Sequence, residues 1–290
     1  MNTFNLSAIS PIDGRYSKVT EDISKYFSEF ALIRYRVYVE IEYFIALYEF
    51  KLPELKNIKK SKIKDLREIV NNFSINDAKK IKKIEDKINH DLKAVEYFIK
   101  EKLKKLGLEE YKEFVHYGLT SQDINNTAIP LMLKDCLKKT IIPSIKIIQK
   151  SINIKSKKFK NIPMVSRTHG QPATPTTFGK ELKVFHERIS VQLDSLIRIP
   201  NNGKFGGASG NLNAHYVSYP KINWDSFSDK FLKKIGLIRS NPTTQIEHYD
   251  NMAAIFHCLS RINTILIDFS KDIWHYVSIN YLKQKVKKMR

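Results

Sequence analysis

The sequence predicts an all-α fold built around long helices, and three observations lead to this prediction. Apolar residues recur at helical spacing through most of the 290 residues. Only 10 glycines and 10 prolines interrupt them. The last long segment, 247–286, carries a heptad seam of apolar residues. The chain is 42% hydrophobic, which is enough for one large domain or two modest ones.

The first third of the chain predicts a series of helices that form an N-terminal helical domain, residues 1–112. Ser74 is a suitable N-cap, and Gly107 can close the last helix of the series. The first helix is rich in aromatic residues, and the next two are rich in lysine. The expected helices span 21–49, 58–72, 74–88 and 91–106.

A longer helical segment begins near Thr120 and continues to residue 158. Pro130 and Pro143 should kink it or divide it into pieces, because proline removes a helix hydrogen bond. The segment opens the second expected domain, 113–290, an incomplete central bundle of long helices. Its apolar stripe consists of Leu133, Leu137, Ile141, Ile145 and Ile148.

The stretch from Ser166 to Glu181 places His169 in a proline-rich connection before the next helix. Gly170, Pro172 and Pro175 should keep this backbone irregular, and Pro175 suits the first turn of a helix that runs to residue 199. A histidine on such a loop can exchange a proton near neutral pH. The local pattern fits an ordinary surface histidine equally well. The helix is indicated by Leu182, Phe185, Ile189, Leu193 and Leu196.

The final helix is expected to pack lengthwise against other helices, some of them in other subunits. It follows a glycine-rich turn or loop at 201–220. Its apolar residues alternate spacings of four and three over three heptads. The seam consists of Ile255, Leu259, Ile262, Leu266, Phe269, Ile273 and Tyr276.

The formal net charge of +20 raises the possibility of nucleic-acid binding. Two features argue against it. Only ten of the 50 basic residues are arginines, which proteins favour for bidentate phosphate and base contacts. The lysines are also scattered over most helices, as on a solvated surface. A nucleic-acid partner is therefore not expected.

The remaining composition predicts a cytoplasmic protein. Cys136 and Cys258 both fall inside helical patterns, as small core residues do in a reducing compartment. The N-terminus lacks the basic-then-apolar order of a signal peptide. No apolar run is expected to be long enough to span a membrane.

Two polar clusters in the first half of the chain could bind an anion or move a proton. Arg15 and Tyr16 follow a turn glycine and could hold a phosphate or carboxylate, although an ordinary turn has the same pattern. His90, between Asn89 and Asp91, could be an acid or base tuned by the neighbouring carboxylate. Asn89 or Asp91 could also merely cap the helix that follows.

Two further clusters lie directly before long helices. Thr120 and Ser121 combine two hydroxyls with the free N–H groups of a helix start, which favours an anion, although capping alone explains them too. The run from Thr243 to His248, which contains Gln245, precedes the last helix. The eight histidines do not fall in metal-ligand spacing, and no P-loop, dinucleotide fingerprint or Gly-x-Ser-x-Gly motif occurs.

Taken together, these clusters resemble the adenylosuccinate lyase family of the fumarase/aspartase superfamily. They occur in the family's order and cover the chain almost from end to end. The bacterial variant whose N-terminus reads SPxDGRY is the one most closely resembled. The matching segments are SPIDGRY at 10–16, KINHDLKAVEYFIKEKL at 87–103, FVHYGLTSQDINNTA at 114–128, SRTHGQPATPTTFGKE at 166–181 and TTQIEHYD at 243–250.

The resemblance implies a fold and a reaction. The family has three mostly helical domains, and its central bundle assembles four subunits into a homotetramer. The implied activity is the β-elimination of fumarate from adenylosuccinate to give AMP, and from the succinyl-carboxamide ribotide of purine synthesis. The family uses no metal and no organic cofactor. Its partners are therefore small-molecule substrates.

The resemblance also implies roles for individual residues. His169 would be the general acid that protonates the departing nitrogen. Donors beside the succinyl carboxylate would stabilise the negative charge that builds up there in the transition state. The implied substrate-binding residues are Arg15 and Tyr16 at the phosphate, Thr120 and Ser121 at a succinyl carboxylate, and Asn89, His90, Asp91 and Gln245 along the substrate.

The sequence departs from the family after Lys283-Gln284-Lys285. The family continues with a loop reading roughly Gly-Ser-Ser-x-Met-Pro, whose serine is the catalytic base, whereas Val286 to Arg290 follow here. No proline occurs after Pro242, so this loop is not present elsewhere. We therefore expect a truncated chain that lacks the base and the C-terminal domain and is inactive alone. One alternative is a functional lyase assembled with a separate C-terminal fragment, and the other is a non-catalytic helical scaffold or a basic nucleic-acid-binding remnant.

Overall fold

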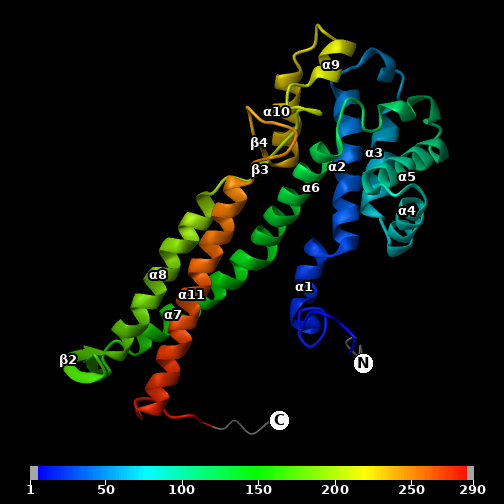
Figure 1. Ribbon diagram of the computed structural model, residues 1–290. Coiled ribbons are helices and arrows are strands. Elements are labelled where there is room, and N and C mark those ends of the chain that lie inside the picture. Colours follow the sequence, from blue (N-terminus) through cyan, green and yellow to red (C-terminus); the bar gives the residue numbers. More distant parts are fainter. Residues whose placement is uncertain (1–5, 286–290) are drawn as a thin grey trace. The chain divides into compact units, whose positions relative to one another are not determined.

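The computed structural model describes residues 6–285 and divides into two compact units (Figure 1). The first unit comprises Met1–Thr140 and Pro200–Tyr249, and the second comprises Ile141–Ile199 and Asp250–Arg290. The fold is mostly helical, as the sequence predicts. The domain boundary at residue 112 stays a prediction.

The helices of the first unit begin near the predicted positions. The segment expected as one helix at 21–49 is divided at Ser28, which has an extended backbone and whose hydroxyl accepts a hydrogen bond from Ala31 N at 3.2 Å. Ser74 caps its helix in a capping box with Asp77, as predicted. The helices are α1 (Ser17–Phe27), α2 (Glu29–Glu49), α3 (Lys60–Asn71), α4 (Ile75–Ile88), α5 (Asp91–Lys105), α6 (Ser121–Cys136), α9 (Asn213–Ser218) and α10 (Trp224–Ile235), with short 3-10 turns η1 (Pro53–Leu55) and η2 (Glu109–Phe114).

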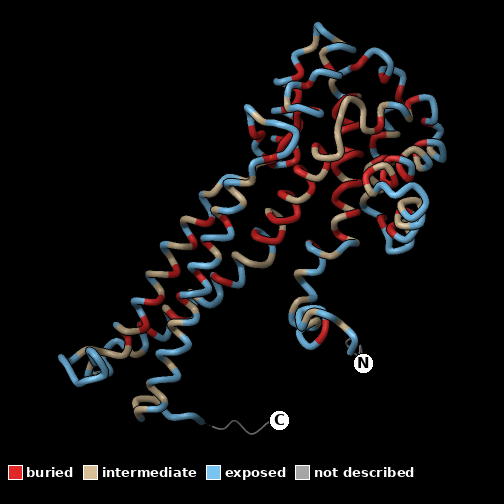
Figure 2. Tube along the Cα trace, viewed as in Figure 1, coloured by how far each residue is buried: buried red, intermediate tan, exposed pale blue. Residues whose placement is uncertain are grey.

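Helix α2 forms the centre of the first unit and is buried along most of its length (Figure 2). It packs against α3, α5 and α6. Its phenol Tyr43 contacts the rings of Phe205, Phe227 and Phe231, and Phe227 packs edge-on against Trp224. Burying aromatic side chains of this size contributes roughly 1.5–3 kcal/mol each. This aromatic cluster fixes the residue 200–240 segment against α2.

The two prolines of the long segment behave differently. Helix α6 continues through Pro130, so the helix is not divided at this position. Pro130 cannot donate to the carbonyl of Asn126, and that carbonyl accepts instead from Lys204 N at 3.1 Å. Near Pro143 the helix does change, through the π-helical turn η3 (Leu137–Ile141). Proline then occupies the first turn of α7 (Ile142–Lys158).

The second unit consists of three long helices and a hairpin. Helix α8 (Phe178–Arg198) packs against both α7 and α11 (Asp250–Ser278). Of the predicted seam residues on α11, Ile255 and Ile262 are buried and the other five are half-buried. Cys258 and Ile265 are the other buried residues of this helix. The predicted helix at 247–286 therefore exists but is shorter at both ends.

The stretch around His169 forms a hairpin with one irregularity between Val165 and Arg167, where the sequence predicts an irregular loop. Strands β1 (Pro163–Thr168) and β2 (Gln171–Thr177) pair antiparallel, with Val165 opposite Pro175. Proline is tolerated because a two-stranded ribbon has only edge strands. Pro175 therefore lies in a strand rather than in a first helical turn, and Thr177 is the N-cap of α8, accepting from Lys180 N at 3.2 Å.

The segment 201–220, expected to be a turn or loop, contains a short strand and a helix. Strand β3 (Asn202–Gly203) pairs in parallel with β4 (Ile238–Arg239), and the glycine-rich loop that follows leads into α9. Gly203 lies against α6, where a side chain would meet Asn126 O. The loop therefore contacts the first turns of α6.

Helix α11 is long and apolar enough to cross a membrane, judged by length and composition among the described residues. The expectation that no segment meets this criterion was therefore wrong. A core helix of a bundle meets the same criterion. Helix α11 packs lengthwise on α8 and pairs Asp268 with Arg188 at 2.9 Å.

Candidate active site

One face of α2 organises the polar residues of the first unit. Arg36, Glu40 and Tyr43 follow one another at helical spacing and are all buried. Arg36 Nη2 donates to Asp91 Oδ2 at 2.7 Å, and Arg36 Nε donates to Asn125 Oδ1 at 2.9 Å. This guanidinium therefore joins the start of α5 to the first turns of α6.

The turn of Asn89, His90 and Asp91 lies between α4 and α5. Asn89 closes α4 in the left-handed conformation, with φ of 53°. His90 is the N-cap of α5, and its Nδ1 accepts from Lys93 N at 3.2 Å. An accepting Nδ1 leaves Nε2 to carry the proton of the neutral ring. His90 is exposed, so Nε2 can donate to a ligand.

Thr120 and Ser121 form the start of α6, as the sequence predicts. Asp123 Oδ2 accepts from Thr120 N at 2.9 Å, which is the carboxylate half of a capping box. Both residues are half-buried. The two residues lie at the N-terminus of the helix, where the helix dipole favours an anion.

His116 lies four residues before Thr120 and packs against α2 and α5. Its Nδ1 is 2.6 Å from Glu40 Oε1, and its Nε2 is 4.0 Å from Glu96 Oε1. Burial lowers the pKa of His116, but the hydrogen bond and charge of Glu40 outweigh it and raise the pKa overall. Burial raises the pKa of Glu40. Lys93 Nζ lies 2.7 Å from Glu96 Oε2 and extends this group of charges.

The loop that carries Gln245 is attached to α6 through Asn126. Asn126 Oδ1 accepts from Glu247 N at 2.6 Å, and its Nδ2 donates to Tyr249 Oη at 2.5 Å. Glu247 is buried and accepts from Ser240 Oγ at 2.7 Å. Gln245 itself is exposed. Asn126 lies just over one turn beyond Ser121, so this loop meets the same end of α6 as the hydroxyls.

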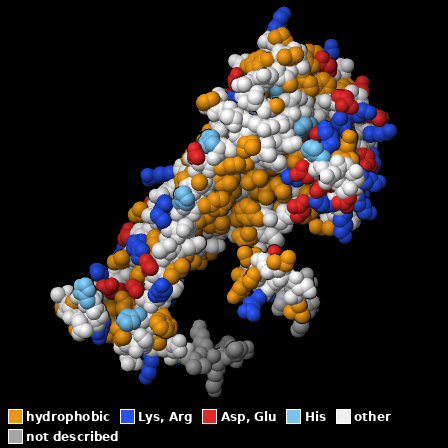
Figure 3. Space-filling view, viewed as in Figure 1, with side chains coloured by type: hydrophobic (Ala, Val, Ile, Leu, Met, Phe, Trp, Pro, Cys, Tyr) orange, Lys and Arg blue, Asp and Glu red, His pale blue; other side chains and the backbone are white. Residues whose placement is uncertain are grey.

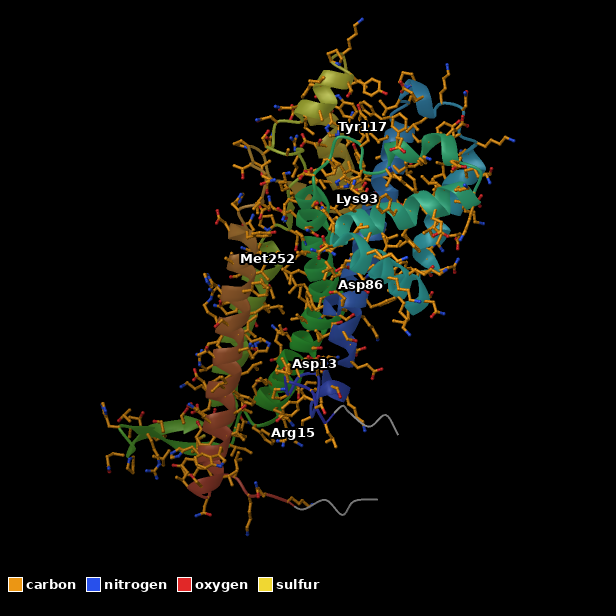
Figure 4. All side chains as sticks on the ribbon, turned by 45° about the vertical axis from the view of Figure 1, so that its right-hand side comes forward. Asp13, Arg15, Asp86, Lys93, Tyr117 and Met252 are labelled. Carbon is orange, nitrogen blue, oxygen red and sulfur yellow. The ribbon has the colours of Figure 1, made fainter. Side chains whose placement is uncertain are left out.

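Three of the predicted segments therefore meet at one end of α6, but Arg15 and Tyr16 lie elsewhere in the first unit. Tyr16 is the N-cap of α1, which packs on α2 and α6. Figure 4 shows Arg15 close to the beginning of α2, whereas Lys93 and Tyr117 lie near the beginning of α6. Both Arg15 and Tyr16 are exposed.

His169 belongs to the second unit and occupies the tip of the β1–β2 hairpin. His169 and Gly170 both have positive φ, 53° and 77°, as the two central residues of a type I′ turn require. Arg167 Nη1 donates to Gly170 O at 3.0 Å and fixes the turn. The imidazole is exposed. The hairpin thus presents His169 on a short, hydrogen-bonded support rather than on an irregular loop.

Sequence reasoning missed the residues that hold this site together, namely Arg36, Glu40, Asn126 and Lys204. One signal was available. Arginine and glutamate at a spacing of four, inside a helix whose other residues are nearly all apolar, indicate buried charges that need partners. Nothing comparable identifies Lys204 among the many lysines of the chain. Within residues 6–285, no group of three or more His, Cys, Asp and Glu side chains is arranged to hold a metal ion.

Comparison with protein families identifies the chain. A family model described as Lyase matches residues 14–289. The chain belongs to this lyase family. Its curated relatives include an adenylosuccinate lyase of Dictyostelium discoideum, which is 55% identical over 98% of this chain and 63% of the relative. The adenylosuccinate lyases of Buchnera aphidicola and Escherichia coli K12 are 44% and 42% identical. The family resemblance predicted from the motifs is thereby confirmed.

The chain spans about 63% of the length of these curated lyases. Solved structures show the same fold at low sequence identity. A β-carboxy-cis,cis-muconate cycloisomerase from Acinetobacter calcoaceticus aligns with a TM-score of 0.68 at 20% identity, over 89% of this chain and 57% of that one. A fumarate lyase from Mesorhizobium aligns with a TM-score of 0.68 at 19% identity and the same coverage. The expected fumarase/aspartase-like fold is therefore confirmed.

Proposed function

We propose that this chain provides the substrate-binding and acid part of an adenylosuccinate lyase site. The reaction removes a proton from the succinyl carbon, breaks the C–N bond and releases fumarate and AMP. The same chemistry applies to the succinyl-carboxamide ribotide. The observation that carries the proposal is that relatives named adenylosuccinate lyase match the chain and that the hydroxyl residues Thr120 and Ser121 lie at the N-terminus of α6.

The start of α6 suits the step in which negative charge accumulates. Removing a proton next to a carboxylate pushes charge onto that carboxylate. The hydroxyls of Thr120 and Ser121 and the first N–H groups of α6 would stabilise that charge. Gln245 and His90 come from the segments attached to this end of the helix and would hydrogen-bond other parts of the substrate. Asp91 would act through Arg36, and Asn89 through the turn that it closes.

His169 is proposed as the general acid. The departing nitrogen needs a proton donor whose pKa is near neutrality, and an exposed imidazole at a hairpin tip can approach a ligand. Arg15 and Tyr16 lie away from the start of α6 within the first unit, so they would serve a substrate phosphate in a site completed by another copy of the chain. A homotetramer, as the family resemblance implies, is the proposed assembly.

Exposed apolar residues on the second unit support an assembly of several copies. Trp274 on α11 is 74% exposed, and Val191 on α8 and Ile267 on α11 are also exposed. Apolar side chains along long helices are typical of a bundle that continues into neighbouring subunits.

The face in Figure 3 also shows lysines interleaved with carboxylates over α3 to α5, and ion pairs such as Lys102–Asp77 at 3.0 Å partly neutralise the lysine charges. This favours a small-molecule substrate over nucleic acid. The proposed location of the enzyme is the cytoplasm.

Calorimetry with adenylosuccinate tests the binding half of the proposal, and fumarate release tests turnover. Because the relatives are longer, fumarate release is measured with the chain alone and with the chain mixed with the unmatched part of the Dictyostelium relative. We expect binding by the chain alone, turnover in the mixture, and loss of turnover but not of binding in His169→Gln. Absence of both binding and turnover would contradict the proposal. Tight RNA binding with a steep salt dependence would favour the alternative of a basic binding protein.

A further inference from the structure

The glycine-rich loop 203–210 lies between two segments of the candidate site. A side chain at Gly207 would come within 3.3 Å of Gly118 O, in the turn before Thr120. A side chain at Gly210 would overlap the backbone of Thr243, in the loop that carries Gln245. Both glycines also have positive φ. The loop therefore contacts the Thr120 turn on one side and the Gln245 loop on the other.

A buried ion pair fastens this loop to α6. Lys204 and Asp123 have completely buried side chains, and Lys204 Nζ lies 2.8 Å from Asp123 Oδ1. The same oxygen accepts from Gly206 N at 2.8 Å and from Gly207 N at 3.1 Å. Lys204 Nζ also donates to Gly207 O. The lysine and the carboxylate together provide hydrogen-bond partners for Gly206 N, Gly207 N and Gly207 O of the glycine loop.

Asp123 is at the same time part of the candidate anion site. Its second oxygen, Oδ2, accepts from Thr120 N, and it occupies the third position of α6, within one turn of Ser121. A buried carboxylate with no counter-charge at this place would oppose the binding of a substrate carboxylate. Lys204 supplies that counter-charge from the interior side. Burial lowers the pKa of Lys204, and Asp123 is the group that opposes this shift.

We propose that Lys204 is a positioning residue for the lyase site. It neutralises Asp123 and holds the glycine loop so that the start of α6 accepts the dicarboxylate end of the substrate. The inference rests on the proposed function. It assigns Lys204 no contact with the substrate, since its ammonium is bound to Asp123 and Gly207 inside the protein.

The experiment compares two ligands that differ only in the succinyl group. Calorimetry measures the dissociation constants of adenylosuccinate and of AMP for the 290-residue chain and three variants. The variants are Lys204→Met, which leaves the carboxylate alone, Asp123→Asn, which leaves the ammonium alone, and the double variant, which removes both charges. The readout is selectivity, which is the dissociation constant of AMP divided by that of adenylosuccinate. A general loosening of the fold would weaken the binding of both ligands, so its effect cancels in this ratio.

We expect Lys204→Met to lower selectivity roughly 30-fold, the effect of one unit charge about 8 Å away at an effective dielectric constant of about 20. The double variant should return to within about threefold of the wild-type ratio, since no net charge remains. Asp123→Asn should increase the ratio, since the ammonium of Lys204 then has no counter-charge. Should Lys204→Met fail to fold, Asp123→Asn must still exceed the double variant in selectivity, because these two differ only in the ammonium.

Equal weakening of both ligands in every variant would overturn the inference and leave Lys204 a purely structural residue. The same holds if the double variant is no more selective than Lys204→Met, or if Asp123→Asn does not exceed the double variant. A wild-type chain that binds neither ligand would instead overturn the proposed function and this inference with it. Circular dichroism of each variant identifies those that have lost the fold.

Discussion

Arg36 Nη2 lies 2.7 Å from Asp91 Oδ2, and through this ion pair α2 holds the start of α5. The same guanidinium donates to Asn125 on α6. The side chain of Arg36 is only 9% exposed, so solvent screens the arginine end of this ion pair only weakly. One buried arginine thus connects the His90 turn to the helix that begins at Ser121.

Replacing this arginine should loosen both segments. We expect Arg36→Met to lower the free energy of unfolding by about 2 kcal/mol, since it leaves Asp91 and Asn125 without their charged donor. Adenylosuccinate affinity should fall roughly tenfold, which corresponds to about 1.4 kcal/mol. Arg36→Lys should lose less stability and affinity than Arg36→Met but more than the wild type, because an ammonium lacks the fixed geometry with which the guanidinium binds Asp91 and Asn125 together. Urea unfolding and calorimetry measure the two effects.

Arg34→Met is the matched control for this prediction. Arg34 lies on the same helix and stacks its guanidinium 5.4 Å from the centre of the Tyr35 ring, away from Asp91. We expect its removal to leave ligand affinity within about twofold. Equal loss of affinity in both variants would show that the bridge to Asp91 and Asn125 has no special part in the site.

The sequence alone predicted the helices and the helix starts well, because both depend on residues close together in the chain. Ser74 and Thr120 are followed three residues later by aspartates that complete capping boxes. The division at Ser28 was missed, since apolar residues continue at helical spacing on both sides of it. The hairpin at His169 was missed because Gly170, Pro172 and Pro175 predict an irregular backbone, although an edge strand accepts proline.

His215 should make stability depend on pH. Its ring is completely buried, and burial lowers its pKa to about 4. In the unfolded chain the pKa returns to its ordinary value of about 6.5, so the unfolded state binds the proton first. Stability is therefore lost as the pH falls below about 6.5 toward 4. Between pH 7 and pH 5 the loss due to this residue should be about 2 kcal/mol. Urea unfolding at several pH values measures it.

His215→Gln is the comparison variant, because a glutamine amide can still donate to Tyr43 Oη and does not titrate. The variant should lose less stability than the wild type over the same pH range. His116 should have the opposite effect on stability. Its pKa is raised in the folded chain, so it adds stability at low pH, and this stability is lost as the pH rises through that raised pKa. Identical slopes for wild type and variant would contradict the assignment to His215.

Pro130 should cost the helix less than a proline in a helix interior normally does. The carbonyl that it leaves free, Asn126 O, accepts from Lys204 N. We therefore expect Pro130→Ala to raise the free energy of unfolding by less than about 1 kcal/mol, rather than by the roughly 3 kcal/mol typical of removing an interior proline. Urea unfolding decides between these values. A gain near the larger figure would mean that the bond from Lys204 does not compensate for the proline.

Tyr281 should hold the hairpin that carries His169. Its hydroxyl donates to Val165 O at 3.0 Å, and its ring lies under the guanidinium of Arg167, 5.9 Å from the ring centre. Tyr281→Phe removes the hydrogen bond and keeps the ring, so we expect tryptic cleavage after Arg167 to become several-fold faster. Tyr281→Ala should accelerate it further. Mass spectrometry of fragments ending at Arg167 gives the rates, and unchanged rates in both variants would rule out the clamp.

The partners that hold the site could not be predicted because they are distant in the sequence. Asp123 and Lys204 are 81 residues apart, and Glu40 and His116 are 76 residues apart. No local pattern specifies such pairs, and the folded core brings them together. In contrast, the segments containing Asn89, Thr120 and Gln245 could be picked out because each groups polar residues at a helix end. The contacts that connect these segments to the start of α6 are seen only in the structure.

The most direct test is adenylosuccinate binding by the chain and by the Ser121→Ala variant, with AMP as the second ligand. We expect the chain to bind adenylosuccinate more tightly than AMP. We also expect Ser121→Ala to weaken adenylosuccinate binding roughly tenfold and to change AMP binding by less than about twofold, since only the succinyl carboxylate would meet this hydroxyl. Equal effects on both ligands, or no preference for adenylosuccinate, would contradict a dicarboxylate site at the start of α6.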